Sequence, residues 1–194
     1  MSKEYPLSFT ATSTRIPECM ATVKTYLGCG DWGETRRLVI ANNAYNLNSE
    51  SSLKRIAGEL VKRLRTLSQT ELELLSKSLG DDQKALLWVS VCRTYPFMRA
   101  FAELICERYE SLTPVTLGAY GSLFDEEASR HPELDALTEL TKERLRNQAF
   151  RLAIDCHVLD ESYMPMSLQP TVTTLDAIRE AKANDLLVIP GAQA

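Results

Sequence analysis

The chain has 194 residues, of which 44% are hydrophobic and 25% are charged. This composition is that of a globular protein and excludes an intrinsically disordered chain, which has fewer hydrophobic residues and a higher net charge. The formal net charge of −4 also argues against a surface that attracts nucleic acid everywhere, so binding of an anion has to come from local clusters of basic residues.

In the first half of the chain, apolar residues recur at the three- and four-residue intervals of amphipathic helices. An extended segment is expected over residues 1–13, followed by helices over 14–27, 32–42, 51–66, 70–79, 83–95 and 96–112. Capping residues support several of these helix starts: Asp31 precedes the second helix, Ser49 or Ser51 precedes the third, and Ser68 with Glu71 has the spacing of a capping box before the fourth.

The second half of the chain begins at Pro114, which is the clearest break in the pattern. Helices are predicted over 116–131, 133–157 and 174–185, while residues 160–170 contain two prolines and are compatible with a short hairpin or with a loop. The sequence therefore predicts an all-α protein of two small helical lobes, residues 1–113 and 114–194. A helix, a longer helix and a hairpin in the second lobe would have the order of a winged helix-turn-helix.

Five isolated cysteines indicate reduced, buried thiols rather than disulfides or a zinc site. Their number is odd, no two have the CxxC spacing, and only two histidines accompany them. The N-terminus lacks the apolar stretch of a signal peptide, and the longest apolar run, near residues 86–91, is far shorter than the roughly 20 residues of a membrane span. We therefore expect a cytoplasmic protein that needs no cofactor and does not contact a membrane.

Motifs of the common enzyme classes are absent from the sequence. It has no P-loop, no GxGxxG, no GxSxG and no HExxH motif. The acidic residues Asp125, Glu126 and Glu127 are more typical of a solvated helix face than of a general acid–base pair. The sequence therefore favours a protein that is not an enzyme, although a new kind of active site would leave no recognisable motif.

The helix expected over 51–66 has an unusual density of basic residues. At about 100° per residue, Lys54, Arg55, Lys62 and Arg65 project away from its apolar stripe, and Arg63 lies nearer the boundary. Such a face suits contact with a phosphate backbone, to which Ser51 and Ser52 at the helix N-terminus and Arg36 and Arg37 of the preceding helix are added as candidates. The alternative is an ordinary solvated helix face.

A second candidate lies on the helix expected over 133–157. Arg144, Asn147, Gln148 and Arg151 share one polar side of this helix. Arginine, asparagine and glutamine match the hydrogen-bonding edges of bases in the major groove, so this side is a candidate recognition surface. Such residues are also frequent on ordinary helices, and the alternative is a helix that serves only the core.

Four segments of the sequence together resemble one family. They are the Asp31–Trp32 pair, the basic helix that begins SSLKRI, the segment LLWVSVCRTYPF and the late helix LRNQAFR. In this order, over residues 20–175, the chain resembles the BrxA family, whose members are small proteins encoded in BREX (bacteriophage exclusion) operons. The resemblance implies an all-helical protein of two lobes that acts in phage defence with other BREX proteins and binds DNA. It supplies no motif of assigned functional residues.

The sequence is compatible with three functions. The leading one is a non-enzymatic accessory subunit that binds double-stranded DNA mainly through phosphate contacts. The second is an adaptor that holds larger BREX proteins together without touching DNA, which the net negative charge suits equally well. An enzyme with an unrecognised site is the least favoured.

Overall fold

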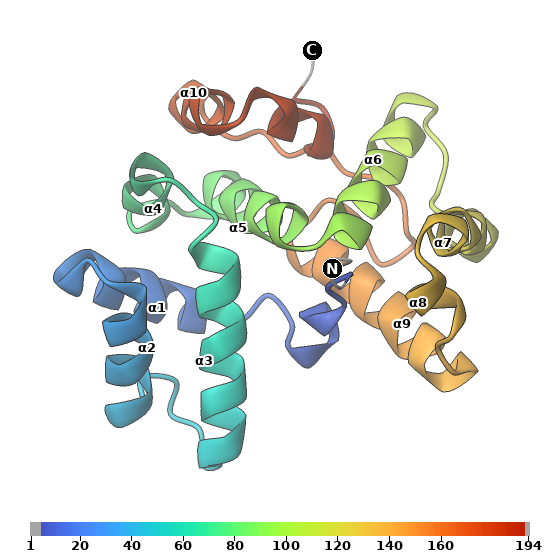
Figure 1. Cartoon of the computed structure of the whole chain (residues 1–194). Helices are drawn as coiled ribbons and strands as arrows, with labels where there is room; N and C mark the ends of the chain where they lie inside the picture. Colours follow the sequence, from blue (N-terminus) through green and yellow to red (C-terminus); the bar gives the residue numbers. More distant parts are fainter. Residues whose placement is uncertain (1–4, 193–194) are drawn as a thin grey trace.

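The computed structural model describes residues 5–192, which form an all-α protein (Figure 1). The elements in chain order are η1 (Ser8–Ala11), α1 (Ile16–Cys29), α2 (Trp32–Ala41), α3 (Glu50–Leu64), α4 (Gln69–Leu75), α5 (Gly80–Thr94), α6 (Pro96–Glu110), α7 (Leu117–Arg130), α8 (Pro132–Asp135), α9 (Glu139–Asp155), α10 (Val172–Ala181) and η2 (Ala183–Val188). The predicted all-α class is confirmed.

Side-chain caps fix several of the helix starts. The Asp31 side chain accepts a hydrogen bond from the Glu34 amide at 2.7 Å at the start of α2. Of the two serines considered for α3, Ser49 is the cap, since it accepts from the Ser52 amide. The capping box between Ser68 and Glu71 is formed at the start of α4.

Two predicted segments differ from the structure. The helix expected over 133–157 is interrupted, because Thr138 leaves the helical conformation and caps a new helix, α9, through its side chain. The extended segment expected over 1–13 contains the 3-10 turn η1, while residues 1–4 lie outside the described part of the chain.

The segment 160–170 is a loop. Its Pro165 forms one isolated antiparallel bridge with Leu159, just before the segment, and residues 5–192 contain no β-strand. A winged helix-turn-helix needs a two-stranded hairpin after its recognition helix. Within the described residues this wing is not formed.

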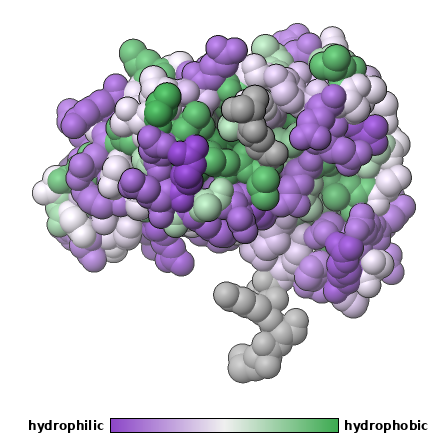
Figure 2. Space-filling view, turned by 90° about the horizontal axis from the view of Figure 1, so that it is seen from above, coloured by the Kyte–Doolittle hydropathy of each residue, from purple (hydrophilic) through white to green (hydrophobic). Residues whose placement is uncertain are grey.

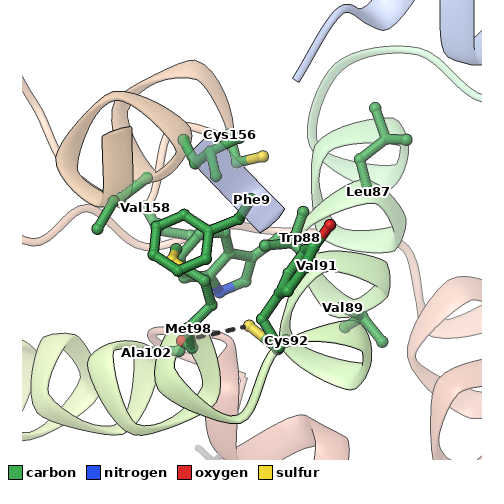
Figure 3. Packing of buried hydrophobic residues seen from close by; sticks show 14 of the residues in the cluster. Phe9, Leu87, Trp88, Val89, Val91, Cys92, Met98, Ala102, Cys156 and Val158 are labelled. Atoms are coloured by element: carbon green, nitrogen blue, oxygen red, sulfur yellow. Dashed lines mark hydrogen bonds between the residues drawn. The ribbon is translucent and has the colours of Figure 1, made fainter. Parts of the chain in front are cut away.

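The core lies where α5 and α6 meet η1 and α9. Figure 3 shows the Phe9 ring of η1 packed among Trp88, Met98 and Cys156, which come from α5, α6 and the end of α9. All four are at most 3% exposed, and the ring of Phe9 also contacts Tyr95 with centroids 5.5 Å apart. The N-terminal segment is therefore part of the interior and holds α9 against the rest of the chain.

One cluster of buried hydrophobic residues extends across Pro114, from Tyr5 to Ile189. The C-terminal segment returns to the first half of the chain, where α10 contacts α4 and α5 and the Trp88 indole donates a hydrogen bond to the Val188 carbonyl at 2.7 Å. These contacts join the two halves of the chain. The division into lobes at residues 113 and 114 stays a prediction.

Four of the five cysteines are buried, as expected, but Cys29 is exposed at the end of α1. None of the five is bonded to another.

Figure 2, seen from the side on which α10 and the C-terminus lie, shows apolar residues gathered near the centre of a largely hydrophilic surface. Among the described helices, none has the length and apolar character needed to cross a membrane.

Candidate nucleic-acid interface

Helix α3 has one buried and one exposed face. Leu53, Ile56, Leu60 and Leu64 are at most 3% exposed and pack into the core. On the opposite side the basic residues at positions 54, 55 and 65 are exposed, and Lys62 is half-buried. The structure therefore places the basic residues on the side that the helical spacing predicts.

A second helix adds a cation to this face. The Arg36 guanidinium, from α2, lies over Gly58 in the middle of the exposed side of α3, so close that a β-carbon at Gly58 would be 3.6 Å from its Nε. The neighbouring Arg37 is exposed but binds Glu34 through two hydrogen bonds of 2.5 and 2.7 Å. Arg36 therefore belongs to the basic surface, whereas Arg37 is neutralised by its neighbour.

The other basic residues of this surface differ in how they are held. Lys54 forms an ion pair with Glu50 at 2.5 Å, and Arg55 donates to the Ala11 carbonyl. Lys62 donates to the Ser8 hydroxyl at 2.8 Å and lies over the Tyr95 ring. We name this surface the α3 cationic face, and it comprises Arg36, Lys54, Arg55, Lys62 and Arg65.

Arg63 is not at the surface, contrary to the boundary position that the helical spacing predicts. It is 2% exposed, and its guanidinium donates to the carbonyls of Thr12 at 3.0 Å and Ser13 at 3.1 Å. Burial lowers the pKa of Arg63, while the charge of Glu59, 3.8 Å away, opposes this effect. The N-terminal segment covers this side of α3, so Arg63 anchors that segment and cannot reach a ligand.

The two serines at the start of α3 are only partly available. The Ser52 amide already donates to the Ser49 side chain at 3.3 Å. The Ser51 hydroxyl is exposed and within 2.9 Å of the Ser49 hydroxyl. Of the contacts expected here, the Ser51 hydroxyl remains open to a phosphate, and the amide of Ser52 does not.

The candidate residues of α9 lie beside the same N-terminal segment. Gln148 donates to the Thr12 carbonyl at 3.1 Å, next to the carbonyl of Ala11 that Arg55 binds. Arg144, Asn147 and Arg151 are exposed. Residues 11 and 12 therefore bridge α3 and α9, as the course of the N-terminal segment in Figure 1 shows, and Gln148 is a bridging residue rather than a free hydrogen-bonding group.

A hollow beside α9 was not expected from the sequence. It has a volume of about 420 Å³ and is lined by Arg146, Asn147, Phe150 and Arg151 of α9 together with Leu117 and Tyr163. No motif joins these residues, because Leu117 begins α7 and Tyr163 belongs to the loop after α9. Among the described residues, no group of three potential metal ligands is found here or elsewhere.

A solved structure shows the same fold. The crystal structure of an uncharacterized protein from Magnetospirillum magneticum matches with a TM-score of 0.80 and 13% sequence identity, and the match covers 96% of each chain. A search of curated proteins found no match.

The sequence also matches a family model over nearly its whole length. The model is that of the BrxA family, and it matches residues 3–181. The chain therefore belongs to the BrxA family and is an accessory protein of a BREX phage-defence system.

Proposed function

We propose that this protein is a non-enzymatic subunit that binds double-stranded DNA through the α3 cationic face. The observation that supports this proposal is the position of Arg36, which α2 adds to four basic residues of α3 on one exposed surface. Glu50 is the one acid that pairs with this face within the described residues. A surface with this excess of positive charge attracts the phosphates of DNA even though the whole chain is acidic.

The α9 helix extends the proposed contact. Arg144 and Arg151 project from α9 on the other side of residues 11 and 12. Contacts to phosphates position a protein on DNA without reading its sequence. We therefore expect binding that depends strongly on salt and weakly on base sequence, with Asn147 as the residue best suited to a base edge.

Fluorescence anisotropy of a labelled duplex of about 30 base pairs, titrated across a salt series, tests this proposal. If the α3 cationic face neutralises about four phosphates, the logarithm of the binding constant should fall against the logarithm of the salt concentration with a slope of about −4. The double variant Arg55→Glu, Arg65→Glu should bind at least about tenfold more weakly and with a slope smaller by about 2.

A matched variant controls for total charge. Lys24 and Lys77 are exposed on α1 and after α4, outside the α3 cationic face. The variant Lys24→Glu, Lys77→Glu has the same net charge as the first variant and should bind DNA nearly as the parent does. Equal losses in both variants would show that total charge governs binding rather than this face.

The adaptor function is supported by a different surface. A groove of about 400 Å³ between α6 and α7 has apolar side chains, including Leu104 and Leu123, and is net negative, because four carboxylates line it together with only two guanidinium groups, those of Arg108 and Arg130. Negative charge repels DNA but attracts a basic protein segment. We propose this groove as the contact with another BREX protein, should the protein act as an adaptor.

Pull-down of the other BREX proteins after nuclease treatment tests the adaptor function. Glu107 lies in the groove and Glu110 lies one turn further along α6, outside it, and both are exposed. Capture that survives nuclease and is lost in Glu107→Lys, but not in Glu110→Lys, would support an adaptor that uses this groove. Capture that nuclease abolishes would place DNA between the two proteins.

A further inference from the structure

The hollow beside α9 is built around an aromatic residue in an unusual backbone conformation. Tyr163 has a φ of +64°, a left-handed conformation that residues other than glycine, asparagine and aspartate rarely adopt. Strained residues of this kind persist where surrounding contacts hold them, and they occur frequently at functional sites.

Hydrogen bonds around Tyr163 hold it in this conformation. The Asp160 side chain accepts from the amides of Ser162 and Met164 at 2.8 and 2.9 Å, and the Tyr163 amide donates to the Asp160 carbonyl at 3.0 Å. The Tyr163 carbonyl accepts from the Val115 amide at 2.9 Å, which joins the loop to the start of α7. The loop therefore fixes the half-buried Tyr163 ring beside Phe150, with ring centroids 4.5 Å apart.

The hollow also leaves an apolar side chain in contact with water. Leu117 is 53% exposed, although leucine is more often buried. It lines the hollow together with the aromatic rings of Phe150 and Tyr163. Apolar and aromatic walls with a few polar groups are typical of sites for small organic ligands.

The charges that line the hollow balance. Arg146 and Arg151 contribute two positive charges, and Asp155 and Glu161 contribute two negative charges. A free phosphate would gain little from such a balance, whereas a neutral, planar group with hydrogen-bonding edges fits it. The Asn147 amide offers donors and an acceptor at the same place, and its oxygen, which accepts from the Arg146 Nε at 3.4 Å, keeps a second lone pair.

We propose that this hollow takes one unpaired nucleobase of a bound DNA. The inference rests on the proposed DNA-binding function, because the hollow shares Asn147 and Arg151 with the α9 surface. The base stacks on the Tyr163 ring and against Leu117, and its edge forms hydrogen bonds with the Asn147 amide. The protein then prefers DNA that contains an unpaired base over a fully paired duplex.

The test compares two DNA probes that differ by one nucleotide. The first is a fully paired duplex of about 30 base pairs, and the second is the same duplex with a single bulged adenine, for which we expect about tenfold tighter binding. A fluorescent adenine analogue at the bulge reports stacking directly, because its emission changes when the base leaves the DNA stack and enters the protein.

Two variants locate the effect. Tyr163→Asn removes the ring while keeping a residue that tolerates the left-handed conformation, and Leu117→Ala removes the exposed apolar wall. Both should reduce the preference for the bulged probe to about threefold or less and leave binding of the paired duplex unchanged. Leu140→Ala is the matched control for Leu117, because Leu140 is 57% exposed and does not line the hollow.

The possible outcomes separate this inference from the proposed function. Equal affinity for the two probes would overturn the base site while leaving duplex binding intact. A preference that survives in both Tyr163→Asn and Leu117→Ala would also overturn it. If neither probe binds, the proposed function fails and this inference fails with it.

Discussion

The end of helix α3 has arginines in two opposite environments only two residues apart, Arg63 in its last turn and Arg65 at its C-cap. Arg63 is 2% exposed and donates hydrogen bonds to carbonyls of the N-terminal segment, whereas Arg65 is exposed and its side chain has no ion pair or hydrogen bond with residues 5–192. The first arginine joins two parts of the chain, and the second faces water. In one helix, therefore, the same residue type serves the fold at one position and is free for a ligand at another.

A second arginine with a largely inaccessible side chain, Arg93 at 7% side-chain exposure, joins other parts of the chain. Arg93 binds Glu71 through two hydrogen bonds of 2.7 Å and Asp185 through one of 2.6 Å. Burial opposes the charge of Arg93, but its hydrogen bonds with these two carboxylates outweigh burial and raise its pKa. Arg63 and Arg93 both have their charge and hydrogen bonds satisfied within the fold, so we expect the fold to depend on them and DNA binding to depend on the α3 cationic face.

The largest expected effect comes from Arg63→Met. This change keeps most of the apolar stem but removes the charge partner of the buried Glu59 carboxylate and the donor to the Ser13 carbonyl, while the Thr12 carbonyl keeps its hydrogen bond from Gln148. Breaking a buried pair in this way costs roughly 3–5 kcal/mol of the free energy of unfolding. Chemical denaturation monitored by circular dichroism measures this loss.

Arg65→Met is the matched change on the exposed side of the same helix. A substitution at an exposed position without contacts should alter the free energy of unfolding by at most about 0.5 kcal/mol. Its effect should appear in DNA binding instead, as a shallower salt dependence. The contrast between the two faces would be contradicted if the two variants lost similar stability.

A somewhat smaller loss is expected from Asp185→Asn. Asp185 is 1% exposed and binds both Arg93 and Arg99, at 2.6 and 2.7 Å, so it attaches η2 to α5 and α6. The amide keeps the shape but removes the charge, and we expect a loss of about 2–3 kcal/mol. Asp176→Asn, at an ion pair with Arg179 that is half exposed, should change stability by less than about 0.5 kcal/mol.

Helical spacing and capping predicted most of the secondary structure. The Asp31 cap and the Ser68–Glu71 capping box depend on residues three positions apart, so the sequence alone contains the full signal. The break at Thr138 was missed because an apolar repeat continues through it. The Thr138 side chain decides the outcome there by accepting from the Thr141 amide, and threonine favours such a cap without excluding a helix interior.

The sequence predicted which way the basic side chains of α3 point, but it did not predict which of them are at the surface. Spacing within one helix places Lys54, Arg55 and Arg65 outward, because helix geometry alone sets that direction. The burial of Arg63 depends on the N-terminal segment about 50 residues away, and no periodicity reports where that segment packs. The hollow at Tyr163 depends in the same way on a loop meeting α7.

The cysteines, like the arginines and aspartates, include both buried and exposed residues. Burial raises the pKa of the Cys106 thiol to about 12 from an ordinary value of 9.0. Between pH 8 and pH 10 this thiol ionises in the unfolded chain but stays protonated in the folded one, so the unfolded state binds fewer protons and stability falls as the pH rises. The expected loss is about 1.4 kcal/mol for this thiol.

The effect of Cys106 is isolated by comparing how stability changes with pH in two variants. Cys106→Ala should lose about 1.4 kcal/mol less between pH 8 and pH 10 than the parent, whatever its stability at pH 8. Cys29→Ala, which removes an exposed thiol, is the matched control. Denaturation curves at the two pH values measure both. An unchanged pH dependence in Cys106→Ala would mean that the folded chain opens this part of α6 to water.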